Sequence, residues 1–321
     1  MSSAADTAAG AAVAGTGRGD GPRRRWGYLF ERERVLGPVM LLPAVLYLIF
    51  VVGYPLLLAF FYAFSDVTVG SNRFDFVGFQ TFITAIHDPV FLKAIEHSFL
   101  ITGISQALVI VLCTVLAFVL AADFHGKWFL RFLVLMPWTT PVALGAIIWL
   151  WMLDSIFTPF DWFASKLGVI PDGGHLVLLG HAGTAVGSVI AVQTWRMLPL
   201  ATVIVLAGLS SIPQDIEEQA QVDGAGFWRR LFSIQLPLLA PVIMVAILFG
   251  VVFTFTDMAV IFILTGGGPG NATQVLPSWA FYKGINGGNL SVGAADAMFM
   301  FPVLLGITAI VLRMASRIGG E

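Results

Sequence analysis

The sequence predicts an all-α, polytopic membrane protein with six transmembrane helices. Of its 321 residues, 58% are hydrophobic and 11% are charged, and the mean hydropathy is +0.88. A soluble domain is usually about 45–50% apolar and about 25% charged. Six stretches also reach the length of about 20 apolar residues that a helix needs to cross a bilayer core of about 30 Å. Because a backbone in lipid must satisfy its own hydrogen bonds, these stretches are expected to be helices rather than strands.

The remaining residues form a tail and the connections between spans. Residues 1–25 are rich in alanine and glycine, have no apolar period and end in three arginines, so we expect a disordered cytoplasmic tail. The apolar run that follows is too long for a signal peptide, which indicates a retained first span. Residues 26–321 then form the transmembrane domain. The predicted spans are Leu36–Phe64, Ser98–Ala122, Phe129–Leu153, Thr184–Leu209, Pro237–Leu264 and Ala294–Ala315.

The distribution of lysine and arginine predicts the orientation of the chain. Most of the 17 basic residues flank the spans on one side, which includes the N-terminal tail and the loop at 210–236. The positive-inside rule places that side in the cytoplasm, so both termini and this loop are expected there. The net charge of −2 offers no basic excess that would suit nucleic acid.

The loop at 210–236 carries a charged stretch, EEQAQVDGAGFWRRLFSIQLP, between two apolar spans. Pro213 suits the first position of a helix, and acidic side chains in the following turns complement its dipole. Gly224 and Gly226 would end this helix, a second short amphipathic turn would follow, and Pro237 would begin the next span. A helix that only lies on the membrane surface fits the same pattern, although a bare connection needs only a few residues.

These residues resemble a family, the permeases of ABC importers of the maltose, glycerol-phosphate and trehalose type. The loop matches the family's EAA…DGA…I-x-L-P pattern, with Gln219 where alanine is usual. The segments LMPWTTPVALGAIIWLWML, LAGLSSIP and LTGGGPGNATQVLPSWAFYKGI are also similar to the family, so the resemblance covers most of the chain. The matching loop residues are Glu218, Ala220, Asp223, Gly224, Ala225, Ile234, Leu236 and Pro237.

The resemblance implies the six-span fold of type I importer permeases, forming half of a translocation pore in the bacterial inner membrane. It implies four further subunits: a second, homologous permease, two ATPase subunits and an extracytoplasmic sugar-binding protein. The loop would be the coupling helix that docks on an ATPase subunit. The residues implied for that contact are Glu217, Glu218, Ala220, Asp223 and Gly224.

The chain itself is expected to have no enzymatic activity, cofactor or metal. The phosphate-binding motif G-x-x-x-x-G-K-[ST] does not occur in the sequence, so ATP and Mg²⁺ would bind to the partner ATPase. The histidines show no metal-ligand spacing with a carboxylate or thiol. Among carbohydrate permeases the whole chain looks nearest to the trehalose type, which implies a disaccharide such as trehalose, with glycerol phosphate and oligosaccharides open.

Two ionisable residues lie inside the predicted spans, Arg196 in the fourth and Asp257 in the fifth. Such residues are costly in a membrane and mark functional sites by default. Helical spacing puts Arg196 on one face with Gln193 and Leu200, and Asp257 on one face with Gly250 and two neighbours. The resemblance to the maltose-type permease implies sugar contacts at Arg196, Met197, Leu200, Gly250, Phe253, Thr254 and Asp257.

The chemistry of these side chains suits a carbohydrate, because Arg196 and Asp257 can each bond a pair of hydroxyls and Phe253 can stack on a sugar face. The same two charges could instead form an ion pair that only holds two helices together. A second class of function also stays open, a self-contained secondary transporter or channel that uses Arg196 and Asp257 as its ion or proton site.

Overall fold

The computed structural model describes residues 33–71, 74–156, 158–171 and 173–318. The tail predicted at 1–25 lies outside the described residues. The chain divides into two compact units, Met1–Leu58 and Ala59–Glu321. In the first, α2 (Glu33–Leu48) runs through a π turn, η2 (Ile49–Gly53), into the start of α3 (Tyr54–Ala63).

The second unit is almost entirely helical, which confirms the predicted fold class. Its only strands among the described residues are β1 (Ser65–Asp66) and β2 (Asp75–Phe76), which pair antiparallel. The helices are α4 (Gln80–Ile86), α5 (Pro89–Ala121), α6 (Lys127–Thr139), α7 (Val142–Met152), α8 (Pro159–Lys166), α9 (Ala182–Ser210), α10 (Gln214–Val222), α11 (Phe227–Arg230), η3 (Leu231–Gln235), α12 (Leu236–Phe255), α13 (Ala259–Leu264), α14 (Leu276–Phe281), η4 (Tyr282–Asn286), α15 (Leu290–Met298) and α16 (Met300–Ile318).

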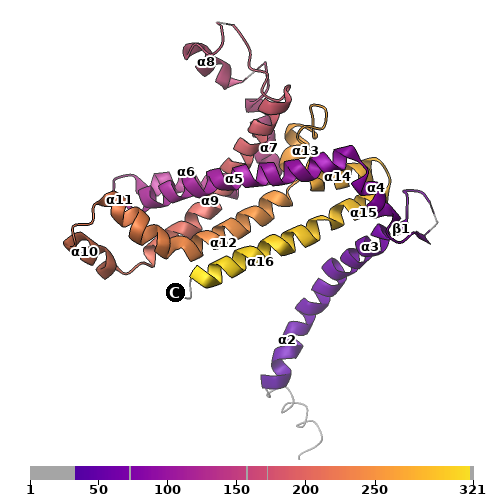
Figure 1. Ribbon diagram of the computed structural model, residues 1–321, viewed down its shortest axis with the longest axis horizontal. Coiled ribbons are helices and arrows are strands. Elements are labelled where there is room, and N and C mark those ends of the chain that lie inside the picture. The colour runs from indigo at the N-terminus through magenta and orange to yellow at the C-terminus, as the bar shows by residue number, and fades with distance from the viewer. Residues whose placement is uncertain (1–32, 72–73, 157, 172, 319–321) are drawn as a thin grey trace, which may run out of the picture. The chain divides into compact units, whose positions relative to one another are not determined.

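The long helices α5, α9, α12 and α16 run side by side as a bundle (Figure 1). Helix α9 packs against α5, α6 and α12, and α16 covers another side of α12. The interior between α5, α9 and α12 is apolar and includes Val109, Met197, Val205 and Leu239. At one end of the bundle lie α10 and α11, and at the other end lie α4, α14 and α15 (Figure 1).

Five helices of the described residues are long and apolar enough to cross a membrane. A sixth crossing results if the helices Lys127–Thr139 and Val142–Met152, which meet at a bend of 102°, count as one broken span. The bend falls at Pro141, whose ring disfavours helical backbone at Thr140, and Thr140 is indeed extended, with a ψ of 130°. The third predicted span is therefore two helices rather than one.

The fifth predicted span, Pro237–Leu264, is shifted in the structure. A continuous helical segment runs from Phe227 to Phe255, so the span begins before Pro237. The π turn η3 precedes Pro237, and the Leu236 N–H donates to the carbonyl five residues earlier. Proline has no N–H for an ordinary helical bond, and this wider turn accommodates it; η2 precedes Pro55 in the same way.

The C-terminal end of that span also differs, because the helix stops at Phe255 and the backbone is non-helical at Asp257. The short helix α13 then begins at Ala259. The prediction that Gly250 and Asp257 lie on one face of the same helix is therefore wrong, because Asp257 lies beyond the end of α12. Aspartate favours such a position because its side chain can accept hydrogen bonds from nearby backbone N–H groups.

Candidate functional site

Asp257 lies in the break between α12 and α13. Its carboxylate accepts hydrogen bonds from the first two N–H groups of α13, from Ala259 to Oδ1 at 3.2 Å and from Val260 to Oδ2 at 3.4 Å. Both groups would lack a helical partner otherwise, and a negative charge is favoured at this end of a helix. The carboxylate is thus fixed at the start of α13.

Two side chains from α9 meet this carboxylate. Arg196 Nη1 lies 3.0 Å from Asp257 Oδ2, an ion pair in which the two side chains are 14% and 8% exposed. Gln193 Nε2 donates to the same oxygen over 2.6 Å. Gln193 and Arg196 are three residues apart on one helix, so they lie on the same face and reach Asp257 together. The two charges therefore form the ion pair that the sequence left open as the alternative to a sugar site.

This polar cluster keeps hydrogen-bonding capacity. Gln193 Oε1 is buried and has no hydrogen-bond partner in the described structure. Arg196 Nη1 contacts the carboxylate by distance without a directed hydrogen bond. The Asp257 carboxylate, with about four acceptor sites, already meets Ala259, Val260, Gln193 and Arg196. The unused capacity of the cluster therefore lies in the five N–H donors of Arg196 and in Gln193 Oε1.

The other predicted contacts divide into a buried group and an exposed group. Met197 is buried in the apolar interior between α5, α9 and α12. Gly250 and Thr254 are also buried, on the α5 side of α12. Leu200 is half-buried, and Phe253 is exposed. Of these five residues, only Phe253 is aromatic, and it is 39% exposed at the surface of the second unit.

Phe253 belongs to an aromatic group that the sequence did not predict. Trp138, near the end of α6, contacts it edge to face with ring centroids 5.8 Å apart. Phe249, one turn earlier on α12, stacks with it at 6.4 Å and an interplanar angle of 20°. All three rings are about 40–50% exposed. A tryptophan placed beside the helix break at Pro141 is the signal that could have identified Trp138.

The predicted coupling segment is a helix followed by a sharp turn. Helix α10 runs from Gln214, with Pro213 at its N-cap rather than inside it. Gly224 ends it with a φ of +72°, a conformation that favours glycine. Gly226 has an ordinary φ of −65° and precedes α11, so it begins the second helix rather than ending the first.

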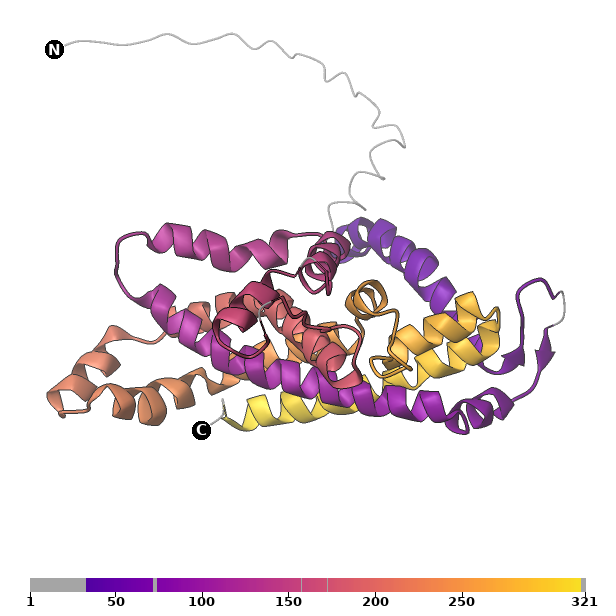
Figure 2. The same cartoon turned by 90° about the horizontal axis from the view of Figure 1, so that it is seen from above.

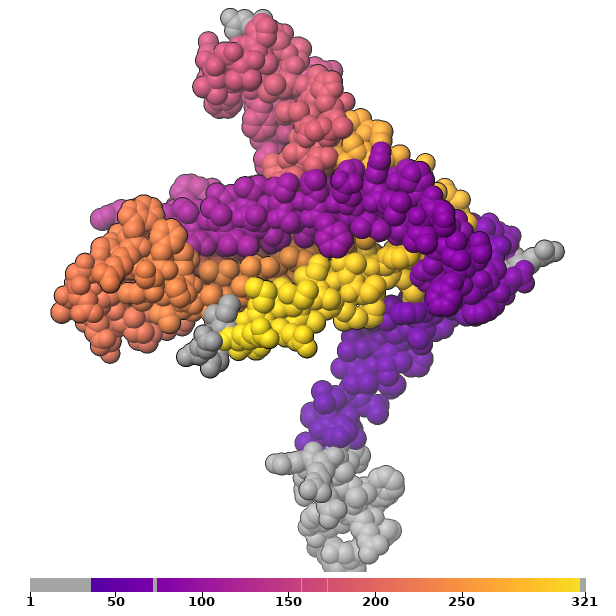
Figure 3. Space-filling view, viewed as in Figure 1, coloured from indigo at the N-terminus to yellow at the C-terminus, as the bar shows by residue number. Residues whose placement is uncertain are grey.

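The five residues predicted for coupling do not all point outward. Ala220 is buried, and Glu217 is half-buried and accepts a hydrogen bond from Gln235 Nε2 at 2.7 Å. This bond ties α10 to the base of α12. Glu218 and Asp223 are exposed, and Val222 beside them is 88% exposed. The segment projects at the end of the bundle (orange in Figures 2 and 3).

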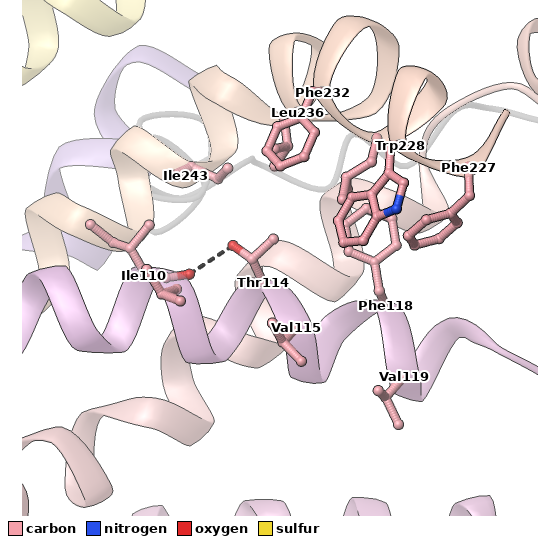
Figure 4. A pocket seen from close by; sticks show the side chains of 12 residues that line it. Ile110, Thr114, Val115, Phe118, Val119, Phe227, Trp228, Phe232, Leu236 and Ile243 are labelled. Carbon is pink, nitrogen blue, oxygen red and sulfur yellow. Dashed lines mark hydrogen bonds between the residues drawn. The ribbon is translucent and has the colours of Figure 1, made fainter. Parts of the chain in front are cut away.

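A groove of about 530 Å³ lies between α5 and the segment that joins α11 to α12. Side chains from the two segments face one another across it (Figure 4). Its lining is apolar apart from Thr114, whose hydroxyl donates to the Ile110 carbonyl at 2.7 Å, and the indole N–H of Trp228. A sugar would find few hydrogen-bond partners there. This groove is therefore not the predicted substrate site, and none of the seven predicted sugar contacts lines it.

Comparison with known proteins gives consistent matches over this fold. Residues 110–318 match the family described as binding-protein-dependent transport system inner membrane component. The trehalose/maltose transport system permease protein MalF of Thermococcus litoralis is 31% identical over 284 residues, which cover 88% of this chain and 94% of that protein. The trehalose transport system permease protein SugA of Mycobacterium tuberculosis is 28% identical over 293 residues, 90% of this chain and 92% of that protein.

A solved structure has the same fold. It is a bacterial alginate ABC transporter in complex with an alginate pentasaccharide-bound periplasmic protein, and one of its chains matches with a TM-score of 0.75 at 21% identity. The match covers 92% of this chain and 98% of that chain. The family match covers more than half of the sequence, and the fold is shared along nearly all of it. The chain therefore belongs to the family of inner membrane components of binding-protein-dependent transport systems.

Proposed function

We propose that this chain is a permease subunit of an ATP-driven carbohydrate importer and that its substrate is a disaccharide of the trehalose type. The observation that carries the proposal is the Arg196–Asp257 ion pair inside the bundle. Two buried charges at the point where α12 breaks are expensive to keep in a membrane protein. The spare N–H donors of Arg196 and the unpaired Gln193 Oε1 fit the vicinal hydroxyls of a sugar.

The aromatic group supports the same ligand class. Trp138, Phe249 and Phe253 present apolar ring faces, and the C–H faces of pyranose rings pack well against such surfaces. A polar cluster near aromatic rings is the usual composition of a selective small-molecule site. The trehalose and maltose relatives support a disaccharide, whereas the alginate transporter supports only the fold.

We further propose that α10 transmits the work of a partner ATPase. Glu217 fixes α10 to the base of α12 through Gln235, so a push on α10 would reach the helix that carries Gly250, Phe253 and Thr254. The exposed residues Glu218, Val222 and Asp223 would contact the ATPase, and a second permease would complete the pore. Both termini would then lie in the cytoplasm.

The decisive experiment is reconstitution with the genetic neighbours. The chain is purified with a second permease, an ATPase and a binding protein, and placed in proteoliposomes with radiolabelled trehalose, maltose or glycerol 3-phosphate. We expect uptake of a disaccharide that needs ATP, the binding protein and both permeases. Uptake by this chain alone, driven by an ion or proton gradient, would instead establish the secondary transporter and refute the importer.

A further inference from the structure

Gln106 is a buried amide in the middle of α5, a helix on which no substrate contact was predicted. Its side chain is 4% exposed. Nε2 donates to Thr254 Oγ1 over 3.1 Å, whereas Oε1 is buried and has no hydrogen-bond partner in the described structure. Leaving a buried acceptor unpaired is costly, above all in a membrane protein. A leucine of similar size would avoid that cost, so the amide calls for a functional explanation.

Gly250 provides the space for this amide. A Cβ atom built on Gly250 would lie 2.0 Å from Gln106 Oε1 and 2.8 Å from Nε2. Even the smallest side chain at this position would therefore displace the amide from Thr254. The resemblance placed Gly250 among the sugar contacts, but the Gln106 amide occupies the space next to it on the side that faces α5.

The bond from Gln106 changes what the Thr254 hydroxyl can do. Thr194 and Thr202 in α9 and Thr256 at the C-cap of α12 each donate their hydroxyl proton to the carbonyl four residues earlier, at 2.7, 2.7 and 2.8 Å. Within the described structure Thr254 makes no such bond, and its oxygen accepts from Gln106 instead. A hydroxyl has one donor and two acceptor positions, so the proton of Thr254 stays free for another acceptor.

Thr254 is directly connected to the charged cluster. The Asp257 backbone N–H donates to the Thr254 carbonyl at 3.3 Å, and Asp257 is the partner of Arg196. A chain of polar contacts thus connects Gln106 on α5, through Thr254 and Asp257 at the end of α12, to Arg196 on α9. Gln106 is the member of this chain that is the most contacts away from the two charged side chains.

We propose that Gln106 is a positioning residue of the sugar site. It holds Thr254 so that the Thr254 hydroxyl donates to an oxygen of the substrate rather than to a carbonyl of its own helix. Gly250 makes this possible because the absence of a side chain there leaves room for the Gln106 amide. The inference rests on the proposed function, because it assigns a role within the same site.

The test compares Gln106→Leu, Thr254→Val and the double variant in the complete complex in proteoliposomes. The readouts are radiolabelled sugar taken up and ATP hydrolysed, measured together with whichever of trehalose, maltose or glycerol 3-phosphate the wild-type complex transports. We expect each variant to lower the sugar transported per ATP about tenfold, the effect of one lost hydrogen bond. The double variant should lower it no further, because Gln106 acts only through Thr254.

Ser105→Ala is the matched control, since Ser105 is the neighbouring buried residue on α5 and its hydroxyl also has no partner in the described structure. It should leave the ratio unchanged. A double variant whose loss is the product of the two single losses would overturn the proposal, and so would an unaltered ratio in Gln106→Leu. If the wild-type complex transports none of the three sugars, the proposed function fails first, and this inference fails with it.

A second pair of variants tests the same role in case Gln106→Leu assembles poorly. Gly250→Ala should lower the ratio in the same way, because its methyl group takes the place of the amide. Adding Gln106→Ala removes that clash, so Gln106→Ala with Gly250→Ala should assemble in wild-type yield and keep the low ratio. Normal transport by Gly250→Ala would contradict the role given to Gln106.

Discussion

Removing the negative charge of Asp257 while keeping its shape is the sharpest test of the charged cluster. Asp257→Asn retains one side-chain oxygen, which can accept from the Ala259 N–H at the start of α13, so that part of the local cap survives. It leaves Arg196 without a counter-charge although that side chain is only 14% exposed. Removing one partner of a buried ion pair costs about 3–5 kcal/mol. We therefore expect a large loss of thermal stability and of complex yield.

The double variant separates a structural pair from a substrate site. Arg196→Met with Asp257→Asn removes both charges, and replacing a buried ion pair by uncharged groups of similar volume is often close to neutral. Stability and yield should return to near wild type. If the two charges bind sugar hydroxyls, uptake stays low while ATP hydrolysis continues. Thermal unfolding in detergent and uptake of labelled sugar, measured on the same preparations, distinguish the two roles.

A surface pair provides the control. Lys127 Nζ lies 3.4 Å from the fully exposed Asp123 carboxylate, and such exposed pairs contribute little to stability. Asp123→Asn should therefore leave stability unchanged. Recovered uptake in the Arg196→Met, Asp257→Asn variant would refute the sugar-binding role, and unchanged stability in Asp257→Asn alone would refute the energetic reasoning.

Three further predictions follow from local geometry. Gly224→Ala forces a side chain into the left-handed region at φ +72°, which should lower the free energy of unfolding by about 1–2 kcal/mol and uncouple ATP hydrolysis from uptake. Gly226 has a φ of −65°, so Gly226→Ala should behave as wild type in the same assays. Gly208→Ala places a Cβ 2.9 Å from a side chain of α12 and should lower stability in a detergent melt by about 1–3 kcal/mol; a normal melt would show that the two helices can separate slightly. The hydrogen bond from the Leu176 N–H and the His175 side chain lower the pKa of Asp161. The ionised Asp161 therefore stabilises the loop fully at pH values above its unfolded pKa of about 3.9. This stabilisation is lost as the pH falls from there through the lowered pKa of the folded state. Amide exchange at Leu176, corrected for its intrinsic rate, should accelerate on acidification in the wild type and lose this pH dependence in Asp161→Asn.

Much of the architecture follows from the sequence because it depends on local composition. Apolar runs of sufficient length determine which segments can cross a bilayer, and glycine at 224 determines where α10 ends. The rarity of charges in these runs singled out Arg196 and Asp257, which the structure brings to 3.0 Å. The functional role of that pair, like the sugar contacts as a set, stays a prediction.

The tertiary structure alone decided where α12 ends and which helix faces meet. Helical periodicity continued through residue 257, but the carboxylate there bonds to the N–H groups that start α13, and no local pattern shows that the helix must stop. Trp138 and Phe253 come from different helices, and only the packing of the bundle brings their rings together. Gly250 shows the same limit: the resemblance placed it among the sugar contacts, and only the fold revealed that the Gln106 amide from α5 approaches it closely. Contacts between distant segments depend on how whole helices pack, and a single helix does not encode that information in its own residues.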